Sequence, residues 1–159
     1  MIKKFNQLFE NNNYSKKEIE DLYTTFHDKY CIAGLLYLMK TTDIDPNFNV
    51  GDGSSLAYID EYFKGDYDTL IDLVKVLIKK GADVNTLDID GKPPISIAKS
   101  YDIIRLLLDA DCDLNIVIDN GDGEDVLEYD ETLRKFVEKE YPKNYEKYLR
   151  KKQAKKFKI

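Results

Sequence analysis

The stretch KKGADVNTLDIDGKPP, residues 79–94, carries two glycines, two prolines and four Asp or Asn residues between two apolar segments. Such residues are typical of turns, so the stretch predicts a loop between two helices. Lys79 and Lys80 suit the negative end of a helix dipole, and Gly81 can take the left-handed conformation that ends a helix. Pro94 suits the first position of the next helix, and we expect the loop to turn near Asp90 and Gly91.

The segment before this loop has the spacing of a buried helix. Leu70, Leu73, Val74 and Leu77 follow the i, i+3, i+4, i+7 pattern. Apolar residues at adjacent positions widen the stripe, so we expect this helix to be buried on more than one side.

The Asp-x-Asn motif of this loop occurs three times in the chain. Asp83–Asn85 is preceded by Asp45–Asn47 and followed by Asp113–Asn115, at offsets of 38 and 30 residues. Each copy is followed by a glycine and a new apolar segment. A period near 33 residues, with a turn and two helices in each unit, is the signature of ankyrin repeats.

The chain therefore resembles the ankyrin repeat family, most closely over residues 73–115. LVKVLIKKGADVN (73–85) is similar to the end of a typical repeat, and DIDGKPPISIA (88–98) resembles the family opening D-x-x-G-x-T-P-L-H-x-A. RLLLDADCDLN (105–115) resembles the next repeat end, with Asp111 in place of the family glycine. Asp tolerates the left-handed conformation better than most residues do.

Pro93 replaces the family threonine and removes its capping hydroxyl. In the flanking repeats, Ser54 or Ser55 and Asp125 can supply that cap. Only four residues separate Ala98 from the next apolar stripe, so we expect the first helix of that repeat to be short.

The resemblance implies an all-α fold, an ankyrin-repeat solenoid of stacked helix-turn-helix units with hairpin-like loops. We expect a single domain over residues 1–159, because each repeat buries its apolar face only against its neighbours. Its expected parts are N-terminal capping helices (1–44), repeats at 45–82 and 83–112, a C-terminal repeat (113–142) and a basic helix or tail (143–159).

Local signals predict the helices of the two ends. Ser15 and Glu18 have the spacing of a capping box, so a helix should begin there. A second helix is expected to contain Cys31, and a last helix to begin at Pro142. Cys31 and Cys112 are predicted to be free thiols, because they are far apart in a chain without a cysteine framework.

The charge is unevenly distributed along the chain. The net charge is −6, but residues 143–159 carry eight Lys or Arg and one Glu, which leaves an acidic body. Apolar runs are far shorter than the roughly 20 residues that cross a bilayer. No secretory signal is visible at the N-terminus, so a cytoplasmic location is expected. An acidic body favours basic partners and repels nucleic acid.

The basic tail has three interpretations. A solvated helix end or a disordered tail is the favoured one. The second is contact with an acidic partner, for which the protein's own acidic body is one candidate. The third is binding to nucleic acid or anionic lipid.

No pattern of catalytic or metal-binding residues is visible in the sequence. His27 is the only histidine, and it is expected to lie at a surface or a helix end. The acidic loops fail the spacing of a calcium-binding EF-hand, and two distant cysteines with one histidine provide no zinc motif. We therefore expect no enzyme activity, no cofactor and no metal.

The family resemblance implies protein binding through the loop tips and the concave face of the first helices. Loop-tip candidates are Val50, Gly51, Asp52, Asp88, Ile89, Asp90, Asn120 and Asp122. Groove candidates are Tyr58, Glu61, Tyr62, Ser96, Lys99, Glu128 and Tyr129.

The predicted partner is a basic protein. In bacteria, small acidic proteins of this kind resemble immunity proteins that neutralise toxins, which is an analogy at the level of the fold. The alternative is a regulatory or scaffold protein whose basic tail contacts nucleic acid or an anionic membrane.

Overall fold

The computed structural model describes residues 14–51, 54–58, 66–118 and 124–156. These residues are mostly helical, and their only extended pairings are two isolated bridges, Asn49 with Ser54 and Val117 with Asp125. The prediction of an all-α chain is therefore confirmed for the described residues. The helices are α2 (Lys16–Asp28), α3 (Ile32–Thr41), α4 (Ser55–Tyr58), α5 (Tyr67–Lys79), α6 (Pro94–Ile97), α7 (Tyr101–Asp109), α8 (Val126–Tyr129), α9 (Glu131–Glu140) and α10 (Pro142–Lys156).

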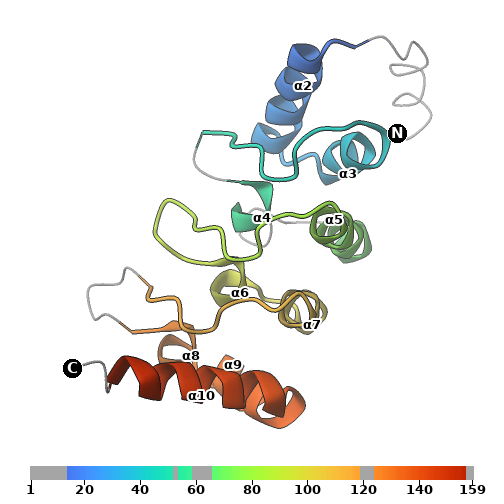
Figure 1. Ribbon diagram of the computed structural model, residues 1–159. Coiled ribbons are helices and arrows are strands. Elements are labelled where there is room, and N and C mark those ends of the chain that lie inside the picture. Colours follow the sequence, from blue (N-terminus) through green and yellow to red (C-terminus); the bar gives the residue numbers. More distant parts are fainter. Residues whose placement is uncertain (1–13, 52–53, 59–65, 119–123, 157–159) are drawn as a thin grey trace.

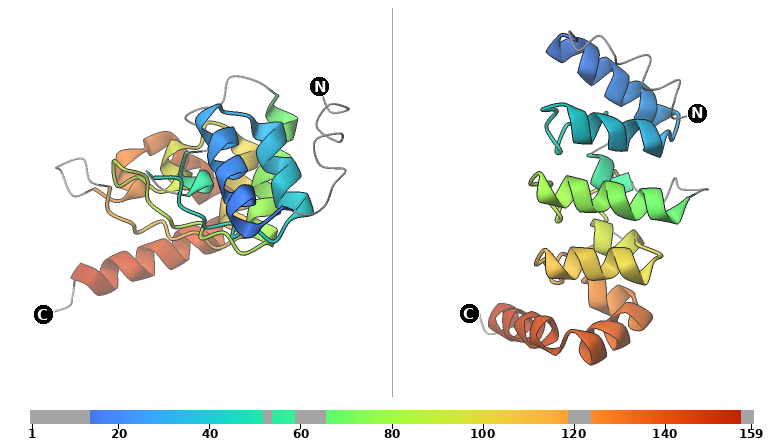
Figure 2. Two further views of the ribbon diagram at one scale, coloured as in Figure 1. Left: turned by 90° about the horizontal axis from the view of Figure 1, so that it is seen from above. Right: turned by 90° about the vertical axis from the view of Figure 1, so that its right-hand side faces the viewer.

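The helices are arranged in successive layers of an elongated molecule (Figure 1). The longer helices α3, α5 and α7 pack against each other in chain order, while the short helices α4, α6 and α8 form a second column beside them. Helix α2 covers α3 at one end, and α9 with α10 closes the other, as the side view in Figure 2 shows. No helix among the described residues is long and apolar enough to cross a membrane.

The core follows the seams between the layers. All four apolar residues of the predicted stripe in α5 are fully buried, and α7 buries Ile103, Ile104, Leu107 and Leu108. Helix α5 is buried on two sides because it packs against both α3 and α7. Each fully buried aliphatic side chain contributes about 1.5–3 kcal/mol, so these seams are the main source of cohesion.

The three Asp-x-Asn corners are joined to one another by hydrogen bonds. The backbone N–H of Asp83 donates to Asn47 Oδ1 (2.7 Å), and that of Asp113 donates to Asn85 Oδ1 (2.6 Å). Within each corner the Asp carboxylate accepts the N–H of the Asn two residues later. The corners therefore lie in register along one edge of the molecule.

The ends of the longer helices agree with the sequence prediction. Gly81 follows α5 with a φ of 93°, and Asp111 follows α7 in the left-handed region with a φ of 59°. The expectation that Asp111 can adopt the left-handed conformation is confirmed. Helix α6 begins at Pro94 and spans only four residues, which confirms the expected short helix.

Helix starts agree with the prediction in most places. Ser15 and Glu18 form a capping box, and Asp125 forms another with Glu128. The predicted serine cap of α4 is wrong, since the Ser55 hydroxyl accepts a hydrogen bond from Tyr23 (2.7 Å) and the buried Ser54 hydroxyl has no partner among the described residues.

The two cysteines are free thiols in the structure. Cys31 is not inside the second helix as expected: it occupies the N-cap position, and α3 begins at Ile32. Burial, together with the neighbouring carboxylates Asp111 and Asp113, raises the pKa of Cys112 to about 12. Since the thiolate is the nucleophile, Cys112 is expected to be unreactive.

The predicted boundaries at residues 44, 82 and 112 fall in the loops that precede α4, α6 and α8. The boundary at residue 142 falls inside α10, one residue after that helix begins.

Candidate protein-binding surface

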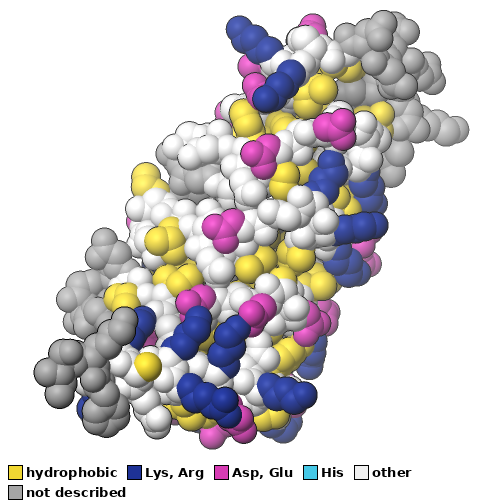
Figure 3. Space-filling model, viewed as in Figure 1, with side chains coloured by type: hydrophobic (Ala, Val, Ile, Leu, Met, Phe, Trp, Pro, Cys, Tyr) yellow, Lys and Arg dark blue, Asp and Glu magenta, His cyan; other side chains and the backbone are white. Residues whose placement is uncertain are grey.

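The loops between the layers all project toward the same side of the molecule (Figure 1). They do so because the corner hydrogen bonds hold the start of each loop against the next. We call the described loop residues 48–51, 86–92 and 116–118 the loop edge. Hydrophobic side chains are visible along this side of the space-filling model (Figure 3).

The middle loop is organised by Asp88. Its carboxylate Oδ1 accepts the N–H groups of Asp90 (2.9 Å) and Lys92 (2.7 Å), and its own N–H donates to the Lys92 carbonyl. Gly91 makes the predicted turn with a φ of 71°. Asp88 is only 7% exposed, so it is not the surface contact residue that the sequence analysis predicted. It holds the loop in shape instead.

The residues on either side of Asp88 point outward. Ile89 is 73% exposed and Leu87 is 45% exposed, while in the next loop Val117 is 51% exposed. Ile118, which follows Val117, is buried in the core. The prediction of Ile89 as a surface residue is therefore confirmed. Sequence reasoning missed Leu87 and Val117. The two-residue spacing of Leu87 and Ile89 was a visible signal, whereas Val117 lies between two other apolar residues, Ile116 and Ile118.

The acidic side of the loop edge includes Asp90, whose exposed carboxylate lies 3.7 Å from the Lys92 ammonium. In the first loop, Gly51 is exposed with a φ of 106°, and its N–H donates to Asn49 Oδ1 (2.8 Å). Val50 is half-buried against the core, so it supports the loop more than it offers contact area.

The short helices carry the groove candidates. Tyr129 is 47% exposed at the end of α8, and Lys99 is exposed just after α6. The Ser96 hydroxyl donates to the Pro93 carbonyl (2.8 Å). Glu128 forms an ion pair with Lys152 of the same chain, so an external partner would have to compete for its carboxylate.

Several predicted contact residues lie outside the described residues. They are Asp52, Glu61, Tyr62, Asn120 and Asp122. Tyr58 ends α4, but its side chain is not described.

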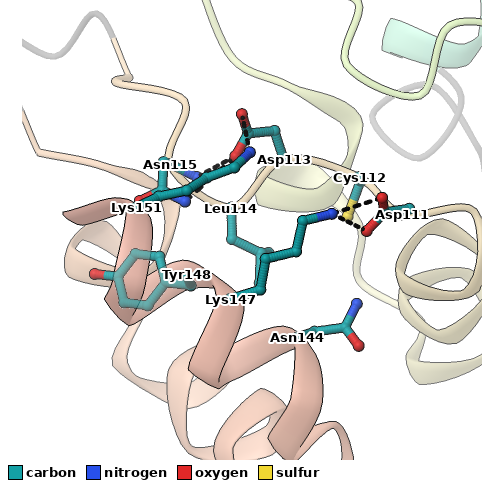
Figure 4. Close-up of a pocket in the computed structure, with 9 residues that line it drawn as sticks. All are labelled: Asp111, Cys112, Asp113, Leu114, Asn115, Asn144, Lys147, Tyr148 and Lys151. Atoms are coloured by element: carbon teal, nitrogen blue, oxygen red, sulfur yellow. Dashed lines mark hydrogen bonds and ion pairs between the residues drawn. The ribbon is translucent and has the colours of Figure 1, made fainter. Parts of the chain in front are cut away.

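The basic tail forms α10 and bonds to the acidic body. Lys147 binds both carboxylate oxygens of Asp111 (2.6 Å each), and Lys151 binds Asp113 (3.1 Å), as Figure 4 shows. One turn further along, Lys155 donates to the Asn115 carbonyl (3.1 Å). The four-residue spacing of these lysines places them on one side of the helix. The structure shows the contact with the protein's own acidic body, while most side chains of α10 remain exposed, as expected of a solvated helix end.

A second cluster fastens α10 to α8. Asp125, buried at the start of α8, accepts hydrogen bonds from Tyr148 Oη (3.1 Å) and Lys152 Nζ (3.1 Å). Lys152 also reaches Glu128, and these carboxylates raise its pKa despite partial burial. Helix α10 thus covers the end of the stack of helices.

Two carboxyl groups under α10 have lowered pKa values. Hydrogen bonds from Lys152 lower the pKa of Glu128. Partial burial opposes ionisation of Asp113, but hydrogen bonds from the Asn115 N–H and from Lys151 outweigh it and lower its pKa. Both groups therefore favour the folded protein only while they are ionised.

These shifts predict a loss of stability in acid. A carboxyl group with a lowered folded pKa stabilises the fold above its unfolded pKa, and this contribution is lost as the pH falls through the folded value. We expect the Tm to fall below about pH 4. Because Lys152→Met removes the cation, it should lower the Tm at pH 7 and flatten this acid dependence. Thermal unfolding monitored by circular dichroism from pH 7 to pH 2 measures both effects.

Lys143→Met is the matched control, since it removes the same charge from α10 outside the clusters with Asp113 and Glu128. Its acid dependence should equal that of the unmodified protein. An unchanged profile for Lys152→Met would contradict the prediction.

No metal-binding cluster is found within the described residues, where no three His, Cys, Asp or Glu side chains converge. His27 lies in the last turn of α2, with its Nδ1 3.8 Å from the Asp28 carboxylate. This agrees with the predicted position at a helix end.

No family model matches this chain, and neither curated proteins nor solved structures give a match. The functional inference therefore depends on the geometry of the surfaces.

Proposed function

We propose that this protein is a non-enzymatic protein-binding module, an ankyrin-repeat solenoid that binds a basic protein partner through its loop edge and its short-helix face. The layered helix pairs, the in-register corners and the left-handed residue after α7 support the ankyrin assignment. Repeat proteins of this type bind partners over an extended surface that several repeats build together.

The observation that carries the proposal is the row of exposed apolar side chains on the loop edge. Leu87 and Ile89 project from the middle loop and Val117 from the next. Exposed apolar groups that are grouped on one surface commonly mark protein interfaces. The loops are held by the corner ladder and by Asp88, so little conformational entropy is lost when a partner binds.

Charge indicates the kind of partner. Asp90 follows Ile89 in the middle loop, where Lys92 lies 3.7 Å from its carboxylate, so the charge argument rests on the net charge of −6 of the whole chain. A negative surface accelerates association with a basic protein. Neutralisation of a basic toxin by an immunity-type protein is one biological role that fits this surface. A toxin-like reading frame next to the gene of this protein would support that role.

The alternative, a scaffold protein whose basic tail binds nucleic acid or membrane, is less well supported. Four lysines of α10 are bonded to groups of the body, which reduces the charge that remains for a polyanion.

The test is a triple variant, Leu87→Ser with Ile89→Ser and Val117→Ser. We expect it to stay folded, because these side chains are exposed, and to bind the physiological partner about a hundredfold more weakly. Affinity purification from the source cell would provide the partner, and calorimetric titration of the purified pair would measure the change.

The control replaces exposed apolar residues elsewhere, Tyr67→Ser with Leu149→Ser, and should bind as the unmodified protein does. Equal affinities of the loop-edge variant and the unmodified protein would refute the loop edge as the binding surface.

A further inference from the structure

An open groove of about 1020 Å³ lies at the first layer, and Phe48 is the one residue of the loop edge that lines it. It is formed by the first turns of α2, the end of α3 and the chain that follows α3. Figure 3 shows hydrophobic side chains in this region, with acidic side chains beside them. Because none of Leu87, Ile89 and Val117 lines the groove, what it binds does not depend on the proposed function.

The floor of the groove is apolar and well supported. Ile19, Ile44 and Phe48 contribute to it, and Ile44 is almost completely buried. The Phe48 ring stands edge-on to the buried Tyr23 ring, with 5.8 Å between centroids. This packing holds the floor in place, so an apolar side chain could be received without rearrangement of the core.

The rim of the groove is negatively charged. Asp43 and Asp45 line it, and both are exposed. Neither forms an ion pair with any described residue. Lys16, which also lines the groove, lies 3.7 Å from the Glu20 carboxylate, so it does not offset the two aspartates.

The sequence of this rim occurs again at the other end of the stack. Residues 43–47 read DIDPN and residues 111–115 read DCDLN, so both have the pattern Asp-x-Asp-x-Asn. The middle corner lacks it, because Gly81 occupies the first position. The two motifs are thus the same chemical group presented at opposite ends of one molecule.

The copy at residues 111–115 is bound by a helix of the same chain, α10. Asp111 and Asp113 take the ammonium groups of Lys147 and Lys151, which are one helical turn apart. At the first corner the next repeat, instead of a helix such as α10, packs beneath the motif, and its carboxylates remain at the groove rim. The last corner therefore provides one example of two such carboxylates bound by lysines one helical turn apart, although Asp111 is left-handed and Asp43 is not.

We propose that the groove docks a basic amphipathic helix of a protein partner. Two Lys or Arg side chains one turn apart bind Asp43 and Asp45, and an apolar side chain of the same helix rests on the groove floor. An amphipathic helix supplies what the groove requires, namely cations for Asp43 and Asp45 and an apolar side chain for the floor.

The test uses two capped synthetic helical peptides. One carries leucines on one face with lysines four residues apart beside them, and the other has glutamates in place of the lysines. We expect the lysine peptide alone to bind the full chain. In nitrogen-15 NMR spectra it should shift the amide signals around residues 43–48 and leave those of residues 86–90 unchanged.

The matched variants remove equal charge from different surfaces. Asp43→Asn with Asp45→Asn keeps the side-chain acceptor that holds Asn47, and it should weaken binding of the lysine peptide about five- to tenfold. Asp72→Asn with Asp102→Asn, on α5 and α7 and outside the groove lining, should leave the affinity unchanged.

The proposal is overturned if both peptides bind equally or not at all, or if the two double variants weaken binding equally. It is also overturned if the chain alone dimerises and Asp43→Asn with Asp45→Asn abolishes the dimer, because a second copy would then be the occupant.

Discussion

Replacing Asp125 with alanine is expected to destabilise the protein by about 3 kcal/mol. This one carboxylate caps α8 by accepting the N–H groups of Leu127 and Glu128, and it also binds Tyr148 and Lys152 of α10. Because it is 6% exposed, water cannot replace these bonds, and its loss leaves buried donors without a partner. Urea unfolding at pH 7 measures the change in the free energy of unfolding.

Asp130→Ala is the control for this prediction. Asp130 caps α9 in the same way, through the N–H groups of Thr132 and Leu133. It forms no hydrogen bond or ion pair with the described residues of α10. Its replacement should cost about 1 kcal/mol, the usual value for an N-cap. Similar losses in the two variants would mean that the contacts of Asp125 with α10 contribute nothing.

Gly34→Val is expected to lower the free energy of unfolding by about 2–3 kcal/mol. Gly34 is buried in α3, where a Cβ atom would lie 2.7 Å from the Phe26 ring of α2. Overpacking would force α2 away from α3, although glycine is otherwise a poor residue inside a helix. The free energy of unfolding should show a net loss.

The neighbouring exposed residue provides the comparison. Ala33→Val introduces the same β-branched side chain into α3 at an exposed position, and should cost less than about 1 kcal/mol. Phe26→Leu should recover part of the Gly34→Val loss, since it removes the ring that a valine would meet. If the double variant loses the sum of the two single-variant losses in the free energy of unfolding, the contact with the Phe26 ring is not what destabilises Gly34→Val.

Much of the helix pattern could be predicted, because the signals are local. The end of α5 at Gly81, the start of α6 at Pro94 and the capping box at Ser15 depend on residues within four positions of each other. The left-handed Asp111 was predictable for the same reason, as its conformation is a property of the residue and its own turn.

The candidate surface could be predicted only in part. Ile89 and Tyr129 are exposed as expected, whereas Asp88 is buried and Glu128 is bound to Lys152. Nothing in the stretch around Asp88 shows that its carboxylate faces inward. The four-residue spacing of the tail lysines was visible in the sequence. The carboxylates that bind Lys147 and Lys151 lie 36 and 38 residues away along the chain, so they could not be identified.

The sequence by itself therefore determined where the helices begin and end and where the chain turns, since capping and turn chemistry act within a few residues. Only the tertiary structure decided which charged side chains are used internally and which remain at the surface. The reason is that the burial of a side chain and the partners of a charge are set by neighbours from other layers, as Lys147 on Asp111 and the exposed pair Asp43 and Asp45 illustrate.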